Sequence, residues 1–396
     1  MIFKRGDCKY YCSNLRAYYM HKILILTEHY PSEDNIYNYM FIHSRVLEYI
    51  KCGCEVRVLY LSDVSCVYCY EGVEVNKGAF DEYKDKLLNF SPDVIFTHSP
   101  KKRIVSNIVE IKKTFKVKNY TWIHGVEALS IFRRIFNTSS MKERVSLFTI
   151  GIVQEIRRVL RFRKYAKICE NSNDEFIFVS HWMKKITESD NYIKIEKANL
   201  IPNFIDYEGF ESKRVTSTKN ILIVRSFESR KYANDISIQM LNELNKLRED
   251  FTVTIYGEGR YFNSCIQQLN IGDSRVQATE KMLPREELKE CLKDSKYSFF
   301  MCPTRQDAQG VTMCEAMASG LIVVTNNSTA IPEFVSPEYA IISDDVALSA
   351  EMISNLMNNK KEFLEKSNMA LEYIRNNLSS EILITKELNL INKNDS

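Results

Sequence analysis

The stretch Cys302-Pro-Thr-Arg-Gln-Asp-Ala-Gln-Gly-Val-Thr-Met-Cys-Glu-Ala-Met-Ala-Ser-Gly320 stands between two apolar runs, Tyr297–Met301 and Leu321–Thr325. Both runs are strand candidates, and the residues from Val311 to Ser319 have the apolar spacing of a helix. Gln309-Gly310 supplies a tight turn before that helix. A strand, a turn, a helix and a second strand make one unit of a parallel α/β sheet. The free amides and the positive dipole end of such a helix favour a bound diphosphate.

The same alternation of strands and helices continues outward from this segment. Asn220–Arg225 is a strand candidate upstream of it, and Lys22–Leu26 begins the same pattern in the first half of the chain. Repeated alternation predicts an α/β protein, and the length suits two Rossmann-like domains with parallel sheets. The predicted parts are an N-terminal extension at residues 1–20, a first domain at 21–205, a second domain at 206–370 and a C-terminal helix at 371–396 that packs back on the first domain.

The composition is that of an ordinary soluble globular protein, with 45% hydrophobic and 27% charged residues among 396. A net charge of +3 does not indicate a nucleic-acid partner. The sequence contains neither a secretory leader nor an apolar run of the roughly 18 residues that a membrane span needs, which predicts a cytoplasmic protein. The eleven cysteines lack the spacing of a metal site, so we interpret them as reduced thiols.

Two carboxylates and a basic loop accompany the predicted helix start. Asp307 lies in the turn and Glu315 lies one turn into the helix. Beside a diphosphate, sugar hydroxyls are natural hydrogen-bond donors to such groups, so we assign a ribose to Glu315 and a hexose to Asp307. Arg225 ends a strand, and Arg230 and Lys231 follow it in the loop. These cations can stabilise a departing diphosphate without a metal, and the sequence contains no D-x-D metal motif.

The pattern of Asp307, seven residues and then Glu315-Ala-Met-Ala-Ser-Gly320 resembles the mark of the family-four retaining glycosyltransferases, or glycosyl transferases group one, which have the two-domain GT-B fold. The family usually has Glu at the first position, so Asp307 is shorter by one methylene group. The resemblance extends over nearly the whole chain beyond residue 20. It implies two Rossmann-like domains whose parallel sheets face an interdomain cleft, with the acceptor bound by residues 21–205 and the nucleotide sugar by residues 206–370.

The resemblance also implies roles for individual residues. Ile123-His-Gly-Val-Glu127 is similar to the His-Gly-x-Glu of the family's first domain, in which the histidine faces the reacting sugar. The family's Gly-Gly loop is absent from Glu28–Tyr37, where Asn35 and Tyr37 are candidates for hydrogen bonds to donor or acceptor. The candidate catalytic residues are His124, Asp307, Arg225 and Lys231. The candidate donor-binding residues are Arg230, Gly257, Gly259, Gln309, Gly310, Val311, Thr312 and Glu315, and the acceptor-side candidates are Asn35, Tyr37 and Glu127.

The implied activity is transfer of a hexose-type sugar from a nucleotide diphosphate sugar to a glycan or lipid-linked acceptor. The resemblance implies retention of the anomeric configuration, without a metal or another cofactor, in surface polysaccharide or glycoconjugate biosynthesis. Two alternatives remain open. One is a non-catalytic sugar-nucleotide binding protein, and the other is a different GT-B enzyme such as an epimerase.

Residues 131–167 are strongly basic, with ten Lys or Arg and only two Glu. Apolar residues such as Phe148, Ile152 and Ile156 are interleaved with these charges. A basic amphipathic helix of this kind can lie in an anionic membrane interface, which predicts a peripheral protein at the inner face of the membrane. The same pattern is also typical of a helix that packs on a core and exposes a basic face to solvent. Both interpretations remain open at this point.

Overall fold

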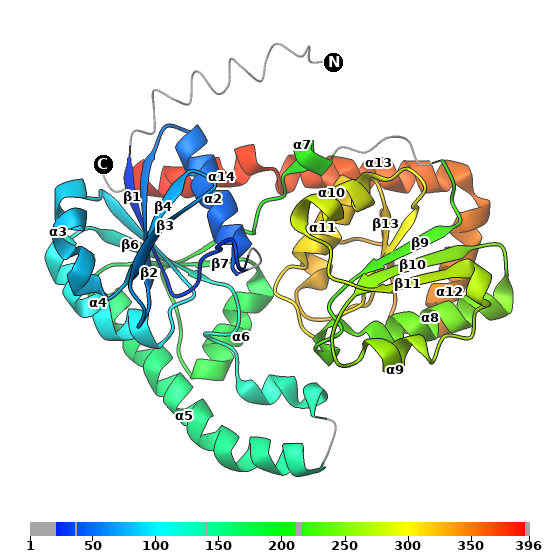
Figure 1. Cartoon of the computed structure of the whole chain (residues 1–396), viewed down its shortest axis with the longest axis horizontal. Coiled ribbons are helices and arrows are strands. Elements are labelled where there is room, and N and C mark those ends of the chain that lie inside the picture. The colour runs from blue at the N-terminus through cyan, green and yellow to red at the C-terminus, as the bar shows by residue number, and fades with distance from the viewer. Residues whose placement is uncertain (1–20, 36–37, 139–140, 211–215, 393–396) are drawn as a thin grey trace. The chain divides into compact units, whose positions relative to one another are not determined.

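The computed structural model describes residues 21–35, 38–138, 141–210 and 216–392, and Figure 1 shows their arrangement into helices and strands. The chain divides into two compact units. The first unit contains the described residues up to Ile131, residues 146–201 and the chain from Ile384, while the second contains residues 132–145 and 202–383. The predicted N-terminal extension, residues 1–20, lies outside the described residues.

The first unit is built on a sheet that has eight strands among the described residues, in the order β3-β4-β2-β1-β5-β6-β7-β8. All neighbours pair in parallel except β3 and β4, which are antiparallel. The strands are β1 (Lys22–Thr27), β2 (Glu55–Leu61), β3 (Cys66–Tyr70), β4 (Val73–Gly78), β5 (Val94–His98), β6 (Lys118–Ile123), β7 (Glu175–Phe178) and β8 (Ala198–Leu200). The predicted parallel α/β architecture is therefore confirmed, and only the β3–β4 hairpin departs from it.

Helices cover the sheet of the first unit because their apolar faces match its buried strands. Helix α4 buries Ile104, Ile108 and Ile111, which lie on one face at spacings of four and three residues. Helix α3 packs beside α4 (Figure 1). The helices of this unit are α2 (Met40–Lys51), α3 (Phe80–Phe90), α4 (Lys102–Phe115), α5 (Met141–Asn171), whose first turn belongs to the second unit, and α6 (His181–Asn191).

The last helix, α14 (Ser380–Asn392), returns to the first unit. Its Glu387 is fully buried, and the Arg45 Nε donates to Glu387 Oε1 over 3.1 Å. The Tyr49 hydroxyl donates to the other oxygen of the same carboxylate. Burial raises the pKa of Glu387, and Arg45 opposes that rise. A single carboxylate thus ties the end of the chain to helix α2.

The second unit is built on a sheet that has six parallel strands among the described residues, in the order β11-β10-β9-β12-β13-β14. Helices α8 and α12 pack side by side (Figure 1). The strands are β9 (Asn220–Val224), β10 (Thr252–Gly257), β11 (Val276–Glu280), β12 (Phe299–Met301), β13 (Ile322–Thr325) and β14 (Ile341–Ile342). The helices are α7 (Tyr207–Phe210), α8 (Asn234–Leu247), α9 (Phe262–Ile266), α10 (Arg285–Lys293), α11 (Val311–Ala318), α12 (Val346–Asn358) and α13 (Lys360–Asn377).

Two features of the chain differ from the predicted domains 21–205 and 206–370 and from the predicted helix at 371–396. Residues 132–145, which include all of the short helix η1 (Ile131–Asn137) except its first residue, group with the second unit, where Asn137 accepts hydrogen bonds from Ser229 and Arg230. The expected helix at 371–396 is divided, since α13 ends at Asn377 and α14 begins at Ser380.

Each sheet has one point at which the order of strands reverses. In the first unit the chain builds outward from β1 through β2, and then returns to place β5 on the other side of β1. In the second unit it builds outward from β9 through β10, and then returns to place β12 beside β9. Ligands of open α/β sheets bind outside the carboxyl ends of the strands at such a switch point. The two places where ligands are expected are therefore the β1–β5 end and the β9–β12 end.

Candidate active site

Two cations share one aromatic ring at the switch point of the second unit. Arg225 directly follows β9, and Lys231 lies in the short helix η2 (Arg230–Tyr232) of the next loop. The Arg225 guanidinium carbon lies 5.0 Å from the centroid of the Tyr232 ring, and the Lys231 Nζ lies 5.1 Å from it. Among the described residues, neither side chain forms an ion pair with a carboxylate. The charges of both cations are therefore available to an anionic ligand.

Arg225 is held by the end of the neighbouring strand. Only 7% of the residue is exposed, and its Nη2 donates to the carbonyls of Cys302 and Pro303 over 3.0 and 3.3 Å. The buried Nε finds no acceptor within the described part of the chain. A guanidinium with a fixed orientation and an N–H donor that has no acceptor is suited to bind an oxyanion.

The loop that carries Lys231 is fastened to the loop that leads from β12 to α11. The Thr304 hydroxyl and the Arg305 amide both donate to the Lys231 carbonyl, over 3.0 and 2.8 Å. Arg305 in turn forms a two-point ion pair with Asp235 at the start of α8. These contacts fasten the loop of Lys231 to the loop that precedes the predicted diphosphate-binding helix. Arg230 differs, because its guanidinium lies 5.3 Å from the ring of Tyr261 instead of Tyr232.

Gly257 and Gly259 pack against the loop of Arg225 at distances that no side chain tolerates. A Cβ on Gly257 would lie 2.0 Å from the Arg225 carbonyl oxygen, and a Cβ on Gly259 would lie 2.2 Å from the Glu228 amide nitrogen. The Phe227 amide donates to the Glu258 carbonyl over 2.8 Å, which fastens the two loops. The geometry gives both glycines a packing role, while their predicted contacts with the donor remain a prediction.

The start of helix α11 is partly occupied by its own turn. Gly310 has a φ of 78° and precedes the helix. Asp307 Oδ1 accepts hydrogen bonds from the amides of Gln309 and Gly310, over 3.3 and 3.1 Å. The expectation of a free Gly310 amide is therefore corrected. The amides of Val311 and Thr312, by contrast, have no acceptor in the described chain and remain candidates for a diphosphate.

Glu315 lies buried one turn into α11, with 3% of the residue exposed. Its Oε1 lies 2.5 Å from the Arg285 Nη1, and the Arg285 guanidinium stacks on Phe210 at 5.1 Å. Burial raises the pKa of Glu315, and Arg285 opposes that rise. A carboxylate expected to meet only ribose hydroxyls thus already has a cationic partner that the sequence did not indicate.

Gln309 is bound within the second unit at both ends of its side-chain amide. Its Oε1 accepts from the Asn203 amide over 2.6 Å, and its Nε2 donates to the Asn203 carbonyl over 2.7 Å. Only 1% of Gln309 is exposed. The hydrogen-bonding groups of Gln309 thus fix the segment at Asn203, and its role in donor binding stays a prediction.

Two predicted residues of the first unit, His124 and Glu127, lie just beyond the carboxyl end of β6. His124 Nε2 lies 3.2 Å from His98 Nδ1, and its ring packs on Phe41 at 4.4 Å. Burial lowers the pKa of His124 well below its ordinary value, so the ring is neutral at pH 7. Glu127 Oε1 accepts from the amides of His124 and Gly125, over 2.5 and 3.2 Å.

Two further acceptor-side candidates, Asn35 and Tyr37, stay predictions. Asn35 closes a tight turn with Ser32, where its amide donates to the Ser32 carbonyl over 3.0 Å. Tyr37 lies outside the described residues. Sequence reasoning missed Tyr232, although an aromatic residue directly after Arg230-Lys231 was a local signal for a shared cation site. It could not have found Arg285, because the pairing with Glu315 is remote in sequence.

A metal site is not evident in the described chain, where no three His, Cys, Asp or Glu side chains come together as ligands. Residues 218–359 match the family model described as Glycosyl transferases group 1. The predicted family resemblance is therefore confirmed for this part of the chain. A search of curated protein sequences gives no match.

Several solved structures share the fold over nearly the whole chain. TarM has a TM-score of 0.67 at 12% identity, covering 95% of this chain and 99% of its own. A glycosyltransferase from Rickettsia africae has a TM-score of 0.67 at 13% identity, with the same coverage. HepE from Anabaena, in complex with UDP and glucose, has a TM-score of 0.67 at 11% identity and covers 94% of this chain and 100% of its own. At these identities the likeness shows a GT-B fold, as predicted.

Proposed function

We propose that this protein is a glycosyltransferase that moves a hexose-type sugar from a nucleoside diphosphate donor to a hydroxyl of a glycan or lipid-linked acceptor. The observation that carries the proposal is the cluster of Arg225, Lys231 and Tyr232, which contacts the loop that leads from β12 to α11. This cluster lies at the β9–β12 switch point of a unit that matches the group-1 family. The UDP and glucose bound by the structural neighbour HepE support the same class of donor.

The proposed reaction breaks the bond between the anomeric carbon and the diphosphate oxygen and forms a bond from that carbon to the acceptor oxygen. The acceptor hydroxyl gives its proton to the departing phosphate on the same face of the sugar, so the configuration is retained. Arg225, Lys231 and the amides of Val311 and Thr312 stabilise the negative charge that develops on the leaving group. These groups supply that stabilisation without a metal or another cofactor.

Asp307 and Glu315 of the second unit, and His124 of the first unit, are each proposed to hold hydroxyl groups. Asp307 uses Oδ1 in its own turn, and its Oδ2 is proposed to accept from the transferred hexose. Glu315 is proposed to accept from the ribose while Arg285 keeps its charge partly neutralised. The neutral ring of His124 fits hydrogen bonding to a sugar hydroxyl better than it fits stabilisation of charge.

A thermal-shift screen of nucleoside diphosphate sugars tests the donor part of this proposal. We expect one or a few of these compounds to raise the unfolding temperature, and the corresponding nucleoside diphosphate to do so as well. Incubation of the best compound with the protein then separates the alternatives. Release or transfer of the sugar identifies a glycosyltransferase, an altered sugar that stays attached identifies an epimerase, and binding without reaction identifies a non-catalytic binding protein.

We further propose that α5 holds the protein on an anionic membrane surface. Phe148, Ile152, Ile156 and Leu160 recur at every fourth residue of this helix and are between 46% and 62% exposed. Basic residues of 131–167, such as the exposed Arg157, are interspersed between these apolar positions. An apolar stripe this exposed favours the membrane interpretation over a helix that buries its apolar face in a core. None of the described helices is long and apolar enough to span a bilayer, and surface attachment does not require such a helix.

Cosedimentation with vesicles tests the membrane proposal. We expect the protein to pellet with vesicles that contain phosphatidylglycerol, and to pellet less with pure phosphatidylcholine or at high salt. The variant Ile152→Glu should lose binding because it places a charge in the apolar stripe, whereas Leu364→Glu, at an exposed apolar position of α13, is the matched control. Pelleting that ignores lipid charge and salt would exclude this role for α5.

A further inference from the structure

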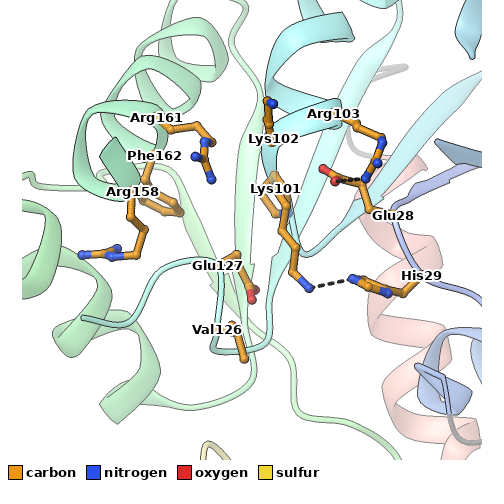
Figure 2. A pocket seen from close by; sticks show the side chains of 11 residues that line it. Glu28, His29, Lys101, Lys102, Arg103, Val126, Glu127, Arg158, Arg161 and Phe162 are labelled. Carbon is orange, nitrogen blue, oxygen red and sulfur yellow. Dashed lines mark hydrogen bonds and ion pairs between the residues drawn. The ribbon is translucent and has the colours of Figure 1, made fainter. Parts of the chain in front are cut away.

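A cavity of about 340 Å³ lies at the switch point of the first unit. It is bounded by the residues that follow β1, β5 and β6, together with one face of α5 (Figure 2). Its position is the first unit's counterpart of the place where Arg225 and Lys231 lie in the second. The lining residues are Glu28, His29, Pro100, Lys101, Lys102, Arg103, Val126, Glu127, Arg158, Arg161 and Phe162.

Two of the lining cations are neutralised by carboxylates. Arg158 is almost buried and forms an ion pair of 2.6 Å with Glu155 on the same helix. Arg103 pairs with Asp63 and lies 3.8 Å from Glu28. Neither residue is therefore expected to supply its charge to a ligand.

Three other cations have no carboxylate partner in the described chain. Lys101 Nζ donates to His29 Nε2 over 2.7 Å and to the Tyr39 hydroxyl over 3.0 Å, both neutral groups. Burial and the charge of Lys101 lower the pKa of His29 to about 4. Lys102 is exposed and Arg161 is half-buried, and neither forms an ion pair among the described residues. The cavity thus keeps an excess of positive charge near the start of α4.

One acceptor remains unused on the wall of this cavity. Only 7% of Glu127 is exposed, and its Oε2 has no hydrogen-bond partner in the described chain. Oε1, in contrast, is used by the amides of its own turn. Figure 2 shows the Glu127 carboxylate on the side of the cavity toward which Lys101 extends. A buried carboxylate oxygen without a donor is able to accept a hydrogen bond from a ligand hydroxyl.

We infer that this cavity binds an acceptor that carries a phosphate group close to a free hydroxyl. The phosphate contacts Lys102 and Arg161, together with the amides of Lys102 and Arg103, which have no acceptor in the described chain. The hydroxyl donates to Glu127 Oε2. A neutral glycan leaves the cations without a counter-charge, and a phosphate without a hydroxyl leaves Glu127 without a donor. This inference rests on the proposed function, because it names the class of acceptor for the proposed transferase.

Calorimetric titration of the full chain with three small probes tests this inference. Glycerol 3-phosphate carries both groups, inorganic phosphate lacks the alcohol hydroxyl next to its phosphate, and glycerol lacks the phosphate. We expect glycerol 3-phosphate to bind about tenfold more tightly than inorganic phosphate, and glycerol not to bind at all. Equal affinities for glycerol and glycerol 3-phosphate, or no binding of either phosphate, would overturn the assignment.

Variants then locate the two halves of the ligand. Arg161→Gln and Lys102→Gln should each raise the dissociation constant of glycerol 3-phosphate about tenfold. Arg157→Gln, one turn earlier on α5 and outside the cavity, removes the same charge and should leave that constant unchanged. Glu127→Gln should abolish the preference for glycerol 3-phosphate over inorganic phosphate, because the amide nitrogen cannot accept from a hydroxyl. Equal losses in Arg157→Gln and Arg161→Gln would show a general charge effect and overturn the site.

A thermal-shift measurement with nucleotide sugars on the same wild-type sample separates this inference from the proposed function. A stabilising nucleotide sugar with no binding of glycerol 3-phosphate would overturn the phosphate-bearing acceptor and leave the transferase proposal intact. If glycerol 3-phosphate binds but no nucleotide sugar stabilises the protein, the cavity is supported as an anion site and the transferase proposal is removed. Vesicles that contain phosphatidylglycerol, titrated with the wild type and with Glu127→Gln, distinguish a lipid-linked acceptor from a free one, because Glu127 lines the cavity and does not belong to the exposed stripe of α5. A weaker vesicle affinity in Glu127→Gln indicates a lipid-linked acceptor, and an unchanged vesicle affinity indicates a free one.

Discussion

The switch points of the two units occupy the same place in similar sheets, yet they hold their cations differently. In the second unit, only 7% of Arg225 is exposed, and its guanidinium is fixed by two carbonyls and an aromatic ring. In the first unit, Lys102 is exposed, and Arg161 reaches the cavity from a separate helix. Topology decides where a ligand lies, while the rigidity of the charged groups decides which step they can serve. A fixed cation stabilises a developing charge without reorganisation, whereas flexible cations can capture an acceptor.

The strongest test of this comparison is Arg225→Ala. Loss of a preorganised charge at the leaving group should lower turnover on the order of a hundredfold or more. The rate of sugar transfer or donor hydrolysis measures this effect. Lys246→Ala, which removes an exposed cation of α8 paired with Glu243, should leave the rate unchanged. A loss in Lys102→Ala as large as that in Arg225→Ala would break the distinction between the two switch points.

The rigidity of the second switch point can be tested through Gly257→Ala. The added Cβ would meet the Arg225 carbonyl oxygen, so we expect the free energy of unfolding to fall by about 2 kcal/mol. Urea unfolding measures the change. Gly272→Ala is the matched control, because its Cβ would enter open space, and it should change the stability by less than about 1 kcal/mol. Equal stability of the two variants would mean that the loop yields.

Glu315→Gln sharpens the comparison at a buried carboxylate. The variant keeps the shape of the side chain but weakens its hydrogen bonds to ribose hydroxyls, so we expect nucleotide affinity to fall about tenfold. Titration with the nucleoside diphosphate found in the screen measures the affinity. Asp345→Asn, at the cap of α12, serves as a control that removes a carboxylate elsewhere in the same unit. An unchanged affinity in Glu315→Gln would contradict the ribose assignment.

The smallest expected effect concerns the pH dependence of the first switch point. His29 has a pKa of about 4 in the folded protein, against an ordinary value of 6.5. As the pH falls from 6.5 to 4, the unfolded chain takes up a proton that the native ring does not, so the free energy of unfolding falls. The variant His29→Gln has no titrating group at this position, so the free energy of unfolding should fall less over the same pH range. We expect a difference of only about 1 kcal/mol, because solvent screens the half-buried ring. Urea unfolding at several pH values measures the difference, and identical curves would contradict it.

Local patterns predicted most of the fold. Buried parallel strands such as β1 are continuous apolar runs, and Val311–Ala318 forms the helix expected after the glycine turn. The β3–β4 hairpin was missed because β3 is an exposed edge strand without a clear alternation. Its turn at Glu71-Gly72, where both residues have positive φ, was the available signal.

The candidate site could be predicted only in part, because several of its contacts join residues remote in sequence. The sequence predicted Arg225, Lys231, Asp307 and Glu315 as site residues, because each lies close to the end of a predicted strand or the start of a predicted helix. The pairing of Gln309 with the Asn203 backbone was not readable, because a buried amide side chain gives no local sign of its partner. Occupation of the Gly310 amide was not predicted, although an Asp commonly accepts from backbone amides two and three residues after it.

Helix α14 has a consequence for the synthesis of the protein. Glu387 supplies the counter-charge for buried Arg45, and the Leu390 carbonyl accepts from the buried Tyr120 hydroxyl. The unit that leaves the ribosome first therefore lacks part of its interior until residues 202–383 have been translated. During that interval Arg45 is a cation without its native counter-charge, which favours a nascent chain that stays open or is held by a chaperone. The first unit thus begins to be translated before the second but is completed after it.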